Sequence, residues 1–160
     1  MNTQNGKVWI YQSDRKLSEQ EVLEIQNKAQ VFVEKWAAHG AQLKASAEVL
    51  FNHFLVLKVD ESQAMASGCS IDSSVAFVKQ IGKEYNIDFF NRLILAFLNN
   101  DNEVELLAMA NISEKVNQGV INENTFVFNN LVTLLADFDT KWKIPMKASW
   151  AAKFLNKTMA

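Results

Sequence analysis

The spacing of apolar residues downstream of Ser18 is that of one face of an α-helix. Apolar side chains recur there at intervals of three and four residues, at Val22, Ile25, Ala29, Phe32 and Trp36. Ser18 and Glu21 have the spacing of a capping box, in which each side chain bonds the other residue's backbone N–H group at a helix start. Gly40, directly after His39, is a typical helix stop. The pattern therefore predicts a helix that begins after Ser18 and ends at Gly40.

Runs and alternation of apolar residues predict strands on either side of this helix. Val8–Tyr11 is a short apolar run typical of a first strand. From Ala47 to Val59 most odd positions are apolar and several even positions are polar, which approaches the period of two expected of a strand. This segment is long for one strand, so we expect a hairpin turn at Asn52–His53 to divide it into two.

A second amphipathic helix follows a loop of small residues. Its apolar face consists of Ile71, Val75, Val78, Ile81 and Tyr85. Ser70 or Asp72 is expected to cap it. The asparagine-rich run at 99–102 predicts a hairpin turn between strands over residues 92–98 and 103–109.

The C-terminal part is predicted to be mainly helical. A short helix that ends at Gly119 and a brief strand over residues 125–128 are expected first. Helical spacing then runs over residues 131–142, and Pro145 breaks it before a last helix.

The order of these elements indicates an α+β fold of one domain over residues 1–160. The first six elements follow the order β-α-β-β-α-β, which is that of ferredoxin-like sandwiches. We therefore expect a mostly antiparallel sheet with helices packed on one face, followed by C-terminal helices. The 49% of hydrophobic residues supply enough material for such a core.

Composition and charge narrow the setting and the partners. No apolar stretch is long enough to span a bilayer, and no signal-peptide segment is present. The single cysteine cannot form an internal disulfide. Together these observations favour a cytoplasmic protein. Five lysines and no acids occur from Lys141 to Ala160. This segment could contact an anionic partner or, more simply, be a terminal helix whose lysines lie in water. Only two arginines occur in the chain, which disfavours nucleic-acid binding.

Residues 66–74 contain the sole cysteine and are the favoured place for chemistry. A helix N-terminus has free backbone N–H groups and favours the thiolate of a nearby cysteine. Cys69 is the candidate nucleophile, with His53 as the candidate base and Asp72 as the group that orients the imidazole. The candidate ligand-binding residues are Ser67, Gly68, Ser70 and Ser73.

Each of these residues also has an ordinary structural interpretation. Cys69 fits a small buried residue of a tight loop, with Gly68 serving the turn. His53 fits a turn residue, and His39, the other candidate base, fits the C-terminal end of a helix. The spacing of the histidines and the cysteine matches no compact metal site, so no metal is expected, and no cofactor either.

Three segments together resemble one family of small bacterial proteins. These are residues 8–13 (Val-Trp-Ile-Tyr-Gln-Ser), 59–61 (Val-Asp-Glu) and 66–74, whose Ser-Gly-Cys-Ser-Ile-Asp core is the most specific part. The family consists of uncharacterised proteins of Bacteroidetes that often carry the label ABC-transporter ATPase. The chain lacks the Gly-x-x-x-x-Gly-Lys-[Ser/Thr] loop with which such ATPases hold phosphates. The resemblance implies a bacterial cytoplasmic setting and carries over no catalytic residue.

Two hypotheses of different classes remain. The favoured one is a non-enzymatic binding or interaction module, whose partner is a protein or a small molecule and in which residues 68–72 are a structural helix start. The other is a cysteine-dependent enzyme or thiol sensor built on Cys69. We favour the module because each proposed catalytic residue has an adequate structural role. The oligomeric state does not follow from the sequence.

Overall fold

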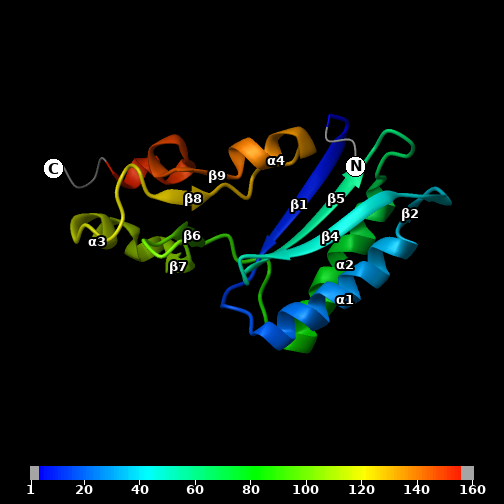
Figure 1. The fold of residues 1–160 in the computed structure, drawn as a ribbon, viewed down its shortest axis with the longest axis horizontal. Coiled ribbons are helices and arrows are strands. Elements are labelled where there is room, and N and C mark those ends of the chain that lie inside the picture. Colours follow the sequence, from blue (N-terminus) through cyan, green and yellow to red (C-terminus); the bar gives the residue numbers. More distant parts are fainter. Residues whose placement is uncertain (1–3, 156–160) are drawn as a thin grey trace.

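The computed structural model describes residues 4–155 and has the α+β fold that the sequence predicts. Within these residues the first half of the chain forms a three-stranded sheet in the order β1-β5-β4, and the second half a four-stranded sheet in the order β7-β6-β8-β9 (Figure 1). The elements of the first half are β1 (Gly6–Gln12), α1 (Glu19–Lys35), β2 (Ala37–Ala38), β3 (Ala41–Gln42), β4 (Lys44–Leu50), β5 (Phe54–Asp60) and α2 (Gly68–Tyr85). Those of the second half are β6 (Ile94–Leu98), β7 (Val104–Ala108), η1 (Met109–Asn111), α3 (Ile112–Asn117), β8 (Phe126–Phe128), α4 (Leu135–Lys141), β9 (Lys143–Pro145), η2 (Met146–Ala148) and η3 (Trp150–Phe154).

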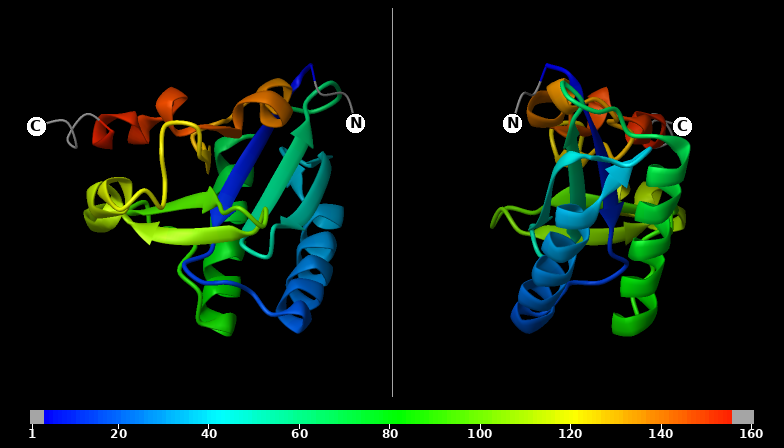
Figure 2. Two further views of the ribbon diagram at one scale, coloured as in Figure 1. Left: turned by 60° about the vertical axis from the view of Figure 1, so that its left-hand side comes forward. Right: turned by 90° about the vertical axis from the view of Figure 1, so that its right-hand side faces the viewer.

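The first sheet packs one face against the two long helices. α1 and α2 lie side by side along that face (Figure 2). Leu55 and Leu57 of the sheet belong to the same buried cluster as Ile25 and Ala29 of α1 and Val78 of α2. This is the expected helical layer on one face of an antiparallel sheet. Within residues 4–155 no helix combines the length and the apolar character needed to cross a bilayer.

The turn between β4 and β5 confirms the hairpin prediction. β4 ends at Leu50 and β5 begins at Phe54. Between them Phe51 and Asn52 have positive φ angles of 54° and 57°. Asparagine adopts this left-handed conformation more readily than most residues, which explains why the chain turns where the sequence predicts.

α1 begins as predicted but ends earlier. Ser18 Oγ accepts a hydrogen bond from Glu21 N at 3.1 Å, and Glu21 Oε1 accepts one from Ser18 N at 2.9 Å. The helix ends before Trp36, whose extended backbone accompanies a hydrogen bond of 2.8 Å from its indole Nε1 to Ser70 O of α2. Gly40 lies in the turn between β2 and β3, with a φ of 78°. The predicted helix end at Gly40 is therefore wrong.

α2 begins earlier than the sequence predicts. Ser67 is the N-cap: its Oγ accepts from Ser70 N at 3.2 Å, and Ser70 Oγ accepts from Ser67 N at 2.7 Å. The predicted caps Ser70 and Asp72 lie inside the helix. Cys69 is therefore part of the first helical turn and not of a preceding loop.

The ferredoxin-like arrangement is not confirmed. β6, which would complete a ferredoxin-like sheet, pairs with β7 and β8 in the second sheet instead. The strands of the second sheet run across those of the first (Figure 2). Val8 and Phe54 of the first sheet share a buried cluster with Ala96 and Phe128 of the second, and this cluster joins the two halves.

The segment before α4 is not the helix that its spacing predicts. α4 starts only at Leu135, and residues 129–134 run beside β1, where Val8 N donates to Thr133 O at 2.9 Å. Leu131 is 70% exposed, so it does not join an apolar helix face. Thr133 O thus accepts a hydrogen bond from β1 instead of one from within a helix.

The lysine-rich C-terminal segment packs through its aromatic residues, with Trp142 in the cluster that joins the two halves and Phe154 in a cluster of the second half. Trp142 and Phe154 are buried, and Lys153 lies over the rings of Trp150 and Phe154. The predicted last helix is observed as two short 3-10 helices, η2 and η3. Lys157 lies outside the described residues. The aromatic packing favours the simpler interpretation of this segment, in which its lysines lie at the surface.

Candidate functional site

The start of α2 uses its hydroxyl groups on its own backbone. Ser67 and Ser70 bond each other's N–H groups, and Ser73 Oγ donates to Ser70 O at 2.8 Å. Gly68 is exposed, and a Cβ atom there would meet nothing within 4 Å. The three serines proposed as ligand-binding residues are therefore occupied in building the helix start.

His53 lies at the opposite end of the first sheet from Cys69. His53 precedes β5, whereas Cys69 follows it in the first turn of α2. At the far end of β5, Glu61 Oε2 accepts a hydrogen bond of 2.8 Å from Ala66 N, which holds the loop before Cys69 there. The seven residues of β5 span about 23 Å at the rise of a strand. The predicted proximity of His53 to Cys69 is therefore wrong.

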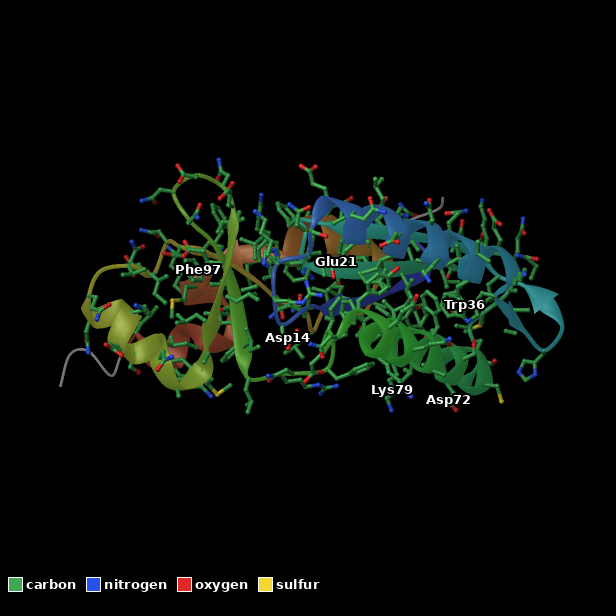
Figure 3. All side chains as sticks on the ribbon, turned by 90° about the horizontal axis from the view of Figure 1, so that it is seen from below. Asp14, Glu21, Trp36, Asp72, Lys79 and Phe97 are labelled. Carbon is green, nitrogen blue, oxygen red and sulfur yellow. The ribbon has the colours of Figure 1, made fainter. Side chains whose placement is uncertain are left out.

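The other candidate catalytic groups also lie apart. His53 is 4% exposed, its Nδ1 lies 2.7 Å from Phe51 O, and burial lowers the pKa of His53 and favours the neutral ring. Asp72 is exposed and points away from the body of the molecule at the start of α2 (Figure 3). His39 is exposed in the turn between β2 and β3. Within residues 4–155 neither histidine hydrogen-bonds Cys69, and no group of three or more His, Cys, Asp or Glu side chains is placed to hold a metal ion.

A groove runs along the outer edge of β1. Its volume is about 560 Å³, and its walls come from β1, from α2, from residues 89–94 and from residues 128–133. Phe90 and Leu131 line it and are 41% and 70% exposed. Most of its lining is apolar, and Arg92 is the one charged residue among the described residues that line it. Sites for small ligands have volumes of roughly 300–1,000 Å³ and similarly apolar walls.

The backbone of β1 leaves polar groups open in this groove. Ser13 N donates to His53 O at 2.7 Å, so the odd-numbered residues of β1 turn their backbone groups toward β5. Val8 N points the other way, to Thr133 O at 2.9 Å. Ile10 therefore directs its N–H and C=O to the outer edge, where it lines the groove. Among the described residues these two groups have no hydrogen-bond partner.

A chain of side-chain hydrogen bonds fixes the walls of the groove relative to one another. Trp142 Nε1 donates to Asn130 Oδ1 at 2.9 Å, and Asn130 Nδ2 donates to Gln12 Oε1 at 2.8 Å. Gln12 Nε2 in turn donates to Ile94 O at 3.1 Å. No local sequence pattern marks these residues, because Gln12 and Asn130 lie 118 positions apart.

Comparisons of the chain with protein-family models, with curated proteins and with solved structures gave no match. The resemblance to the Bacteroidetes family therefore stays a prediction.

Proposed function

We propose that the protein is a non-enzymatic binding module that takes up an extended peptide segment along the outer edge of β1. The observation that carries this proposal is the unpaired N–H and C=O of Ile10 in an apolar groove. An extended peptide that adds a strand to a sheet edge satisfies such groups with its own backbone, while pockets receive its alternate side chains. We place this function in the bacterial cytoplasm, as the family resemblance implies.

The walls of the groove suit such a segment. The exposed side chains of Phe90 and Leu131 on its rim offer apolar contact, and apolar side chains gathered around a concave site are typical of interaction surfaces. The hydrogen bonds from Trp142 to Ile94 hold the walls in place. A site that is already ordered loses less conformational entropy when it binds, which favours affinity.

The cysteine-dependent alternative has weaker support. A cysteine nucleophile needs a base within hydrogen-bond reach, and the predicted base His53 lies at the other end of β5. Cys69 is exposed, but its serine neighbours are engaged in capping α2. The β1 groove has both an apolar surface and open backbone groups, so it is the better candidate site.

The variant Ile10→Pro tests the proposal. Proline removes the outward N–H of Ile10, and an edge position whose N–H faces outward tolerates proline. Ile10→Val keeps the N–H and is the matched control. Random linear peptides displayed on phage are selected on the wild-type protein, and fluorescence polarisation then measures the affinity of the selected peptides for each variant. We expect Ile10→Pro to bind them about tenfold more weakly, the loss of roughly one hydrogen bond, and Ile10→Val to bind them as the wild type does.

Two outcomes contradict the proposal. One is a selection that recovers no binding peptide. The other is a set of peptides that bind Ile10→Pro and the wild type equally well. Circular dichroism and thermal melting of each variant confirm that a loss of affinity is not a loss of folding.

A further inference from the structure

We infer that the bound peptide segment carries a carboxylate and that Arg92 binds it. This inference rests on the proposed function and names the chemistry that the segment must have. Arg92 lines the groove, is exposed and is the one charged side chain among the described lining residues. Within residues 4–155 it has no ion pair and no hydrogen bond to its side chain.

Arg15, the other arginine of the chain, shows how a guanidinium pairs with a carboxylate in this protein. Arg15 Nη1 and Nη2 donate to Glu21 Oε1 and Oε2 at 2.8 and 2.6 Å, and Nη2 also donates to Tyr85 O at 2.7 Å. This is the bidentate pairing that arginine makes with carboxylates. Arg92 has the same fork of donors, and the described residues that line the groove beside it include no acid.

The carboxylates that bond the segment carrying Arg92 do so to its backbone. Asp88 Oδ1 accepts from Phe90 N at 2.8 Å, and Asp14 Oδ1 accepts from Asp88 N at 3.1 Å. These bonds help to position the chain between α2 and β6 while leaving the guanidinium of Arg92 to other partners. A bound molecule is therefore the natural source of a carboxylate for Arg92.

One positive charge in an apolar groove also limits the kind of anion. A single guanidinium balances one carboxylate, whereas a phosphorylated side chain brings a charge of about −1.5 to −2 at neutral pH. The open edge of Ile10 calls for an extended backbone beside this charge. An extended segment offers a carboxylate from Asp, from Glu or from its own C-terminus, and these three sources share the chemistry that Arg92 recognises.

Parallel peptide selections test this inference. The wild type, Arg92→Gln and Lys79→Gln are each presented with two random phage libraries, one whose peptides are fused at the C-terminus and one whose peptides end in a free carboxylate. Lys79 is the matched control, because its Nζ lies 5.8 Å from the centroid of the Phe90 ring while its side chain does not line the groove.

We expect the wild type and Lys79→Gln to select a carboxylate at a fixed position, and Arg92→Gln to lose this preference. Enrichment of Asp or Glu in the fused library identifies a side-chain carboxylate, and preference for the free-ended library identifies the chain terminus. Synthetic peptides of the selected type should bind Arg92→Gln about tenfold more weakly than the wild type. Arg92→Lys should recover part of the affinity, because it keeps the charge without the fork.

The outcomes separate this inference from the proposed function. Peptides that bind at the β1 edge without any carboxylate preference overturn the role of Arg92 and leave the binding module intact. An equal loss of preference in Lys79→Gln and Arg92→Gln overturns it too, because general charge then explains the selection. Recovery of no peptide from either library overturns both.

Discussion

The two edge strands of the first sheet, β4 and β1, differ in how far their outward backbone groups are hydrogen-bonded. At β4 the side chain of Gln26 on α1 covers the edge: its Nε2 donates to Ala47 O at 2.7 Å, and its Oε1 accepts from Val49 N at 2.9 Å. At β1 the segment 129–134 bonds Val8 near the start of the strand and the side chain of Gln12 at its end, and among the described residues the backbone groups of Ile10 between them stay open. Proteins usually cover exposed strand edges, because an open edge invites pairing with other chains. The open edge at β1 is the one to which we propose that a peptide partner adds a strand.

Two glutamines make this contrast specific. Gln26 offers one donor and one acceptor to β4, as a neighbouring strand would. Gln12 belongs to the open edge strand, yet it directs its amide to Ile94 O and to Asn130 in the groove walls. The same side-chain chemistry closes one edge and holds the walls beside the other edge in place.

The largest expected effect comes from proline placed on the two sides of β1. Lys7 is paired with Val59 and turns its N–H toward β5, so Lys7→Pro should lower the free energy of unfolding by about 3 kcal/mol relative to Lys7→Ala. Ile10→Pro should cost less than about 1 kcal/mol relative to Ile10→Ala, because the N–H of Ile10 has no partner among residues 4–155. Urea unfolding of the four variants measures both differences. Similar losses at the two positions would show that the outer edge of Ile10 is not open.

A smaller effect is expected from opening the β4 edge. Gln26→Leu removes two hydrogen bonds to the edge and should lower the free energy of unfolding by about 2 kcal/mol. It should also promote concentration-dependent self-association, measured by analytical ultracentrifugation. Gln30→Leu is the control on the same helix, since within the described part of the chain the amide of Gln30 bonds only Glu34. This substitution should cost less than about 0.5 kcal/mol. Equal stability of the two variants would contradict a capping role for Gln26.

The smallest effect on stability is expected from the ion pair between Arg15 and Glu21. The hydrogen bonds from Arg15, followed by that from the Ser18 backbone, lower the pKa of Glu21 from 4.5 to about 2. Because the folded pKa is the lower one, this stabilisation is complete above about pH 4.5 and is lost as the pH falls toward 2. Ion pairs near the surface contribute at most about 1 kcal/mol, which bounds the effect.

Urea unfolding of the wild type and Glu21→Gln across this pH range measures the contribution of Glu21. The wild type should be the more stable at neutral pH, and the difference should shrink as the solution is acidified. A difference that does not change with pH would rule out the ionised carboxylate as its cause.

The sequence predicts those elements whose signals lie close together. The capping box of Ser18 and Glu21 and the turn at Asn52 depend on neighbouring residues, and both are confirmed. The predicted end of α1 fails because Trp36 bonds Ser70, 34 positions further along the chain. β6 pairs with β8 in the second sheet, and no pattern within the sequence of β6 predicts which strand it will pair with.

The candidate site is harder to predict than the fold. Small residues and the lone cysteine draw attention to residues 66–74, but the structure explains the serines there as a helix start. The groove combines β1 with residues 89–94 and 128–133, which come together only when both sheets are in place. Arg92 is one of only two arginines in the chain, and this rarity is the one local signal that could have marked it.

The hydrogen bonds that run from Trp142 through Asn130 and Gln12 to Ile94 belong both to the walls of the β1 groove and to the junction of the two halves. Widening the groove would therefore strain the same hydrogen bonds that hold the two halves together. A peptide bound at the β1 edge would consequently stabilise the contact between the two halves. Its binding would also change the surroundings of the Trp142 indole, which lies far along the chain from Ile10.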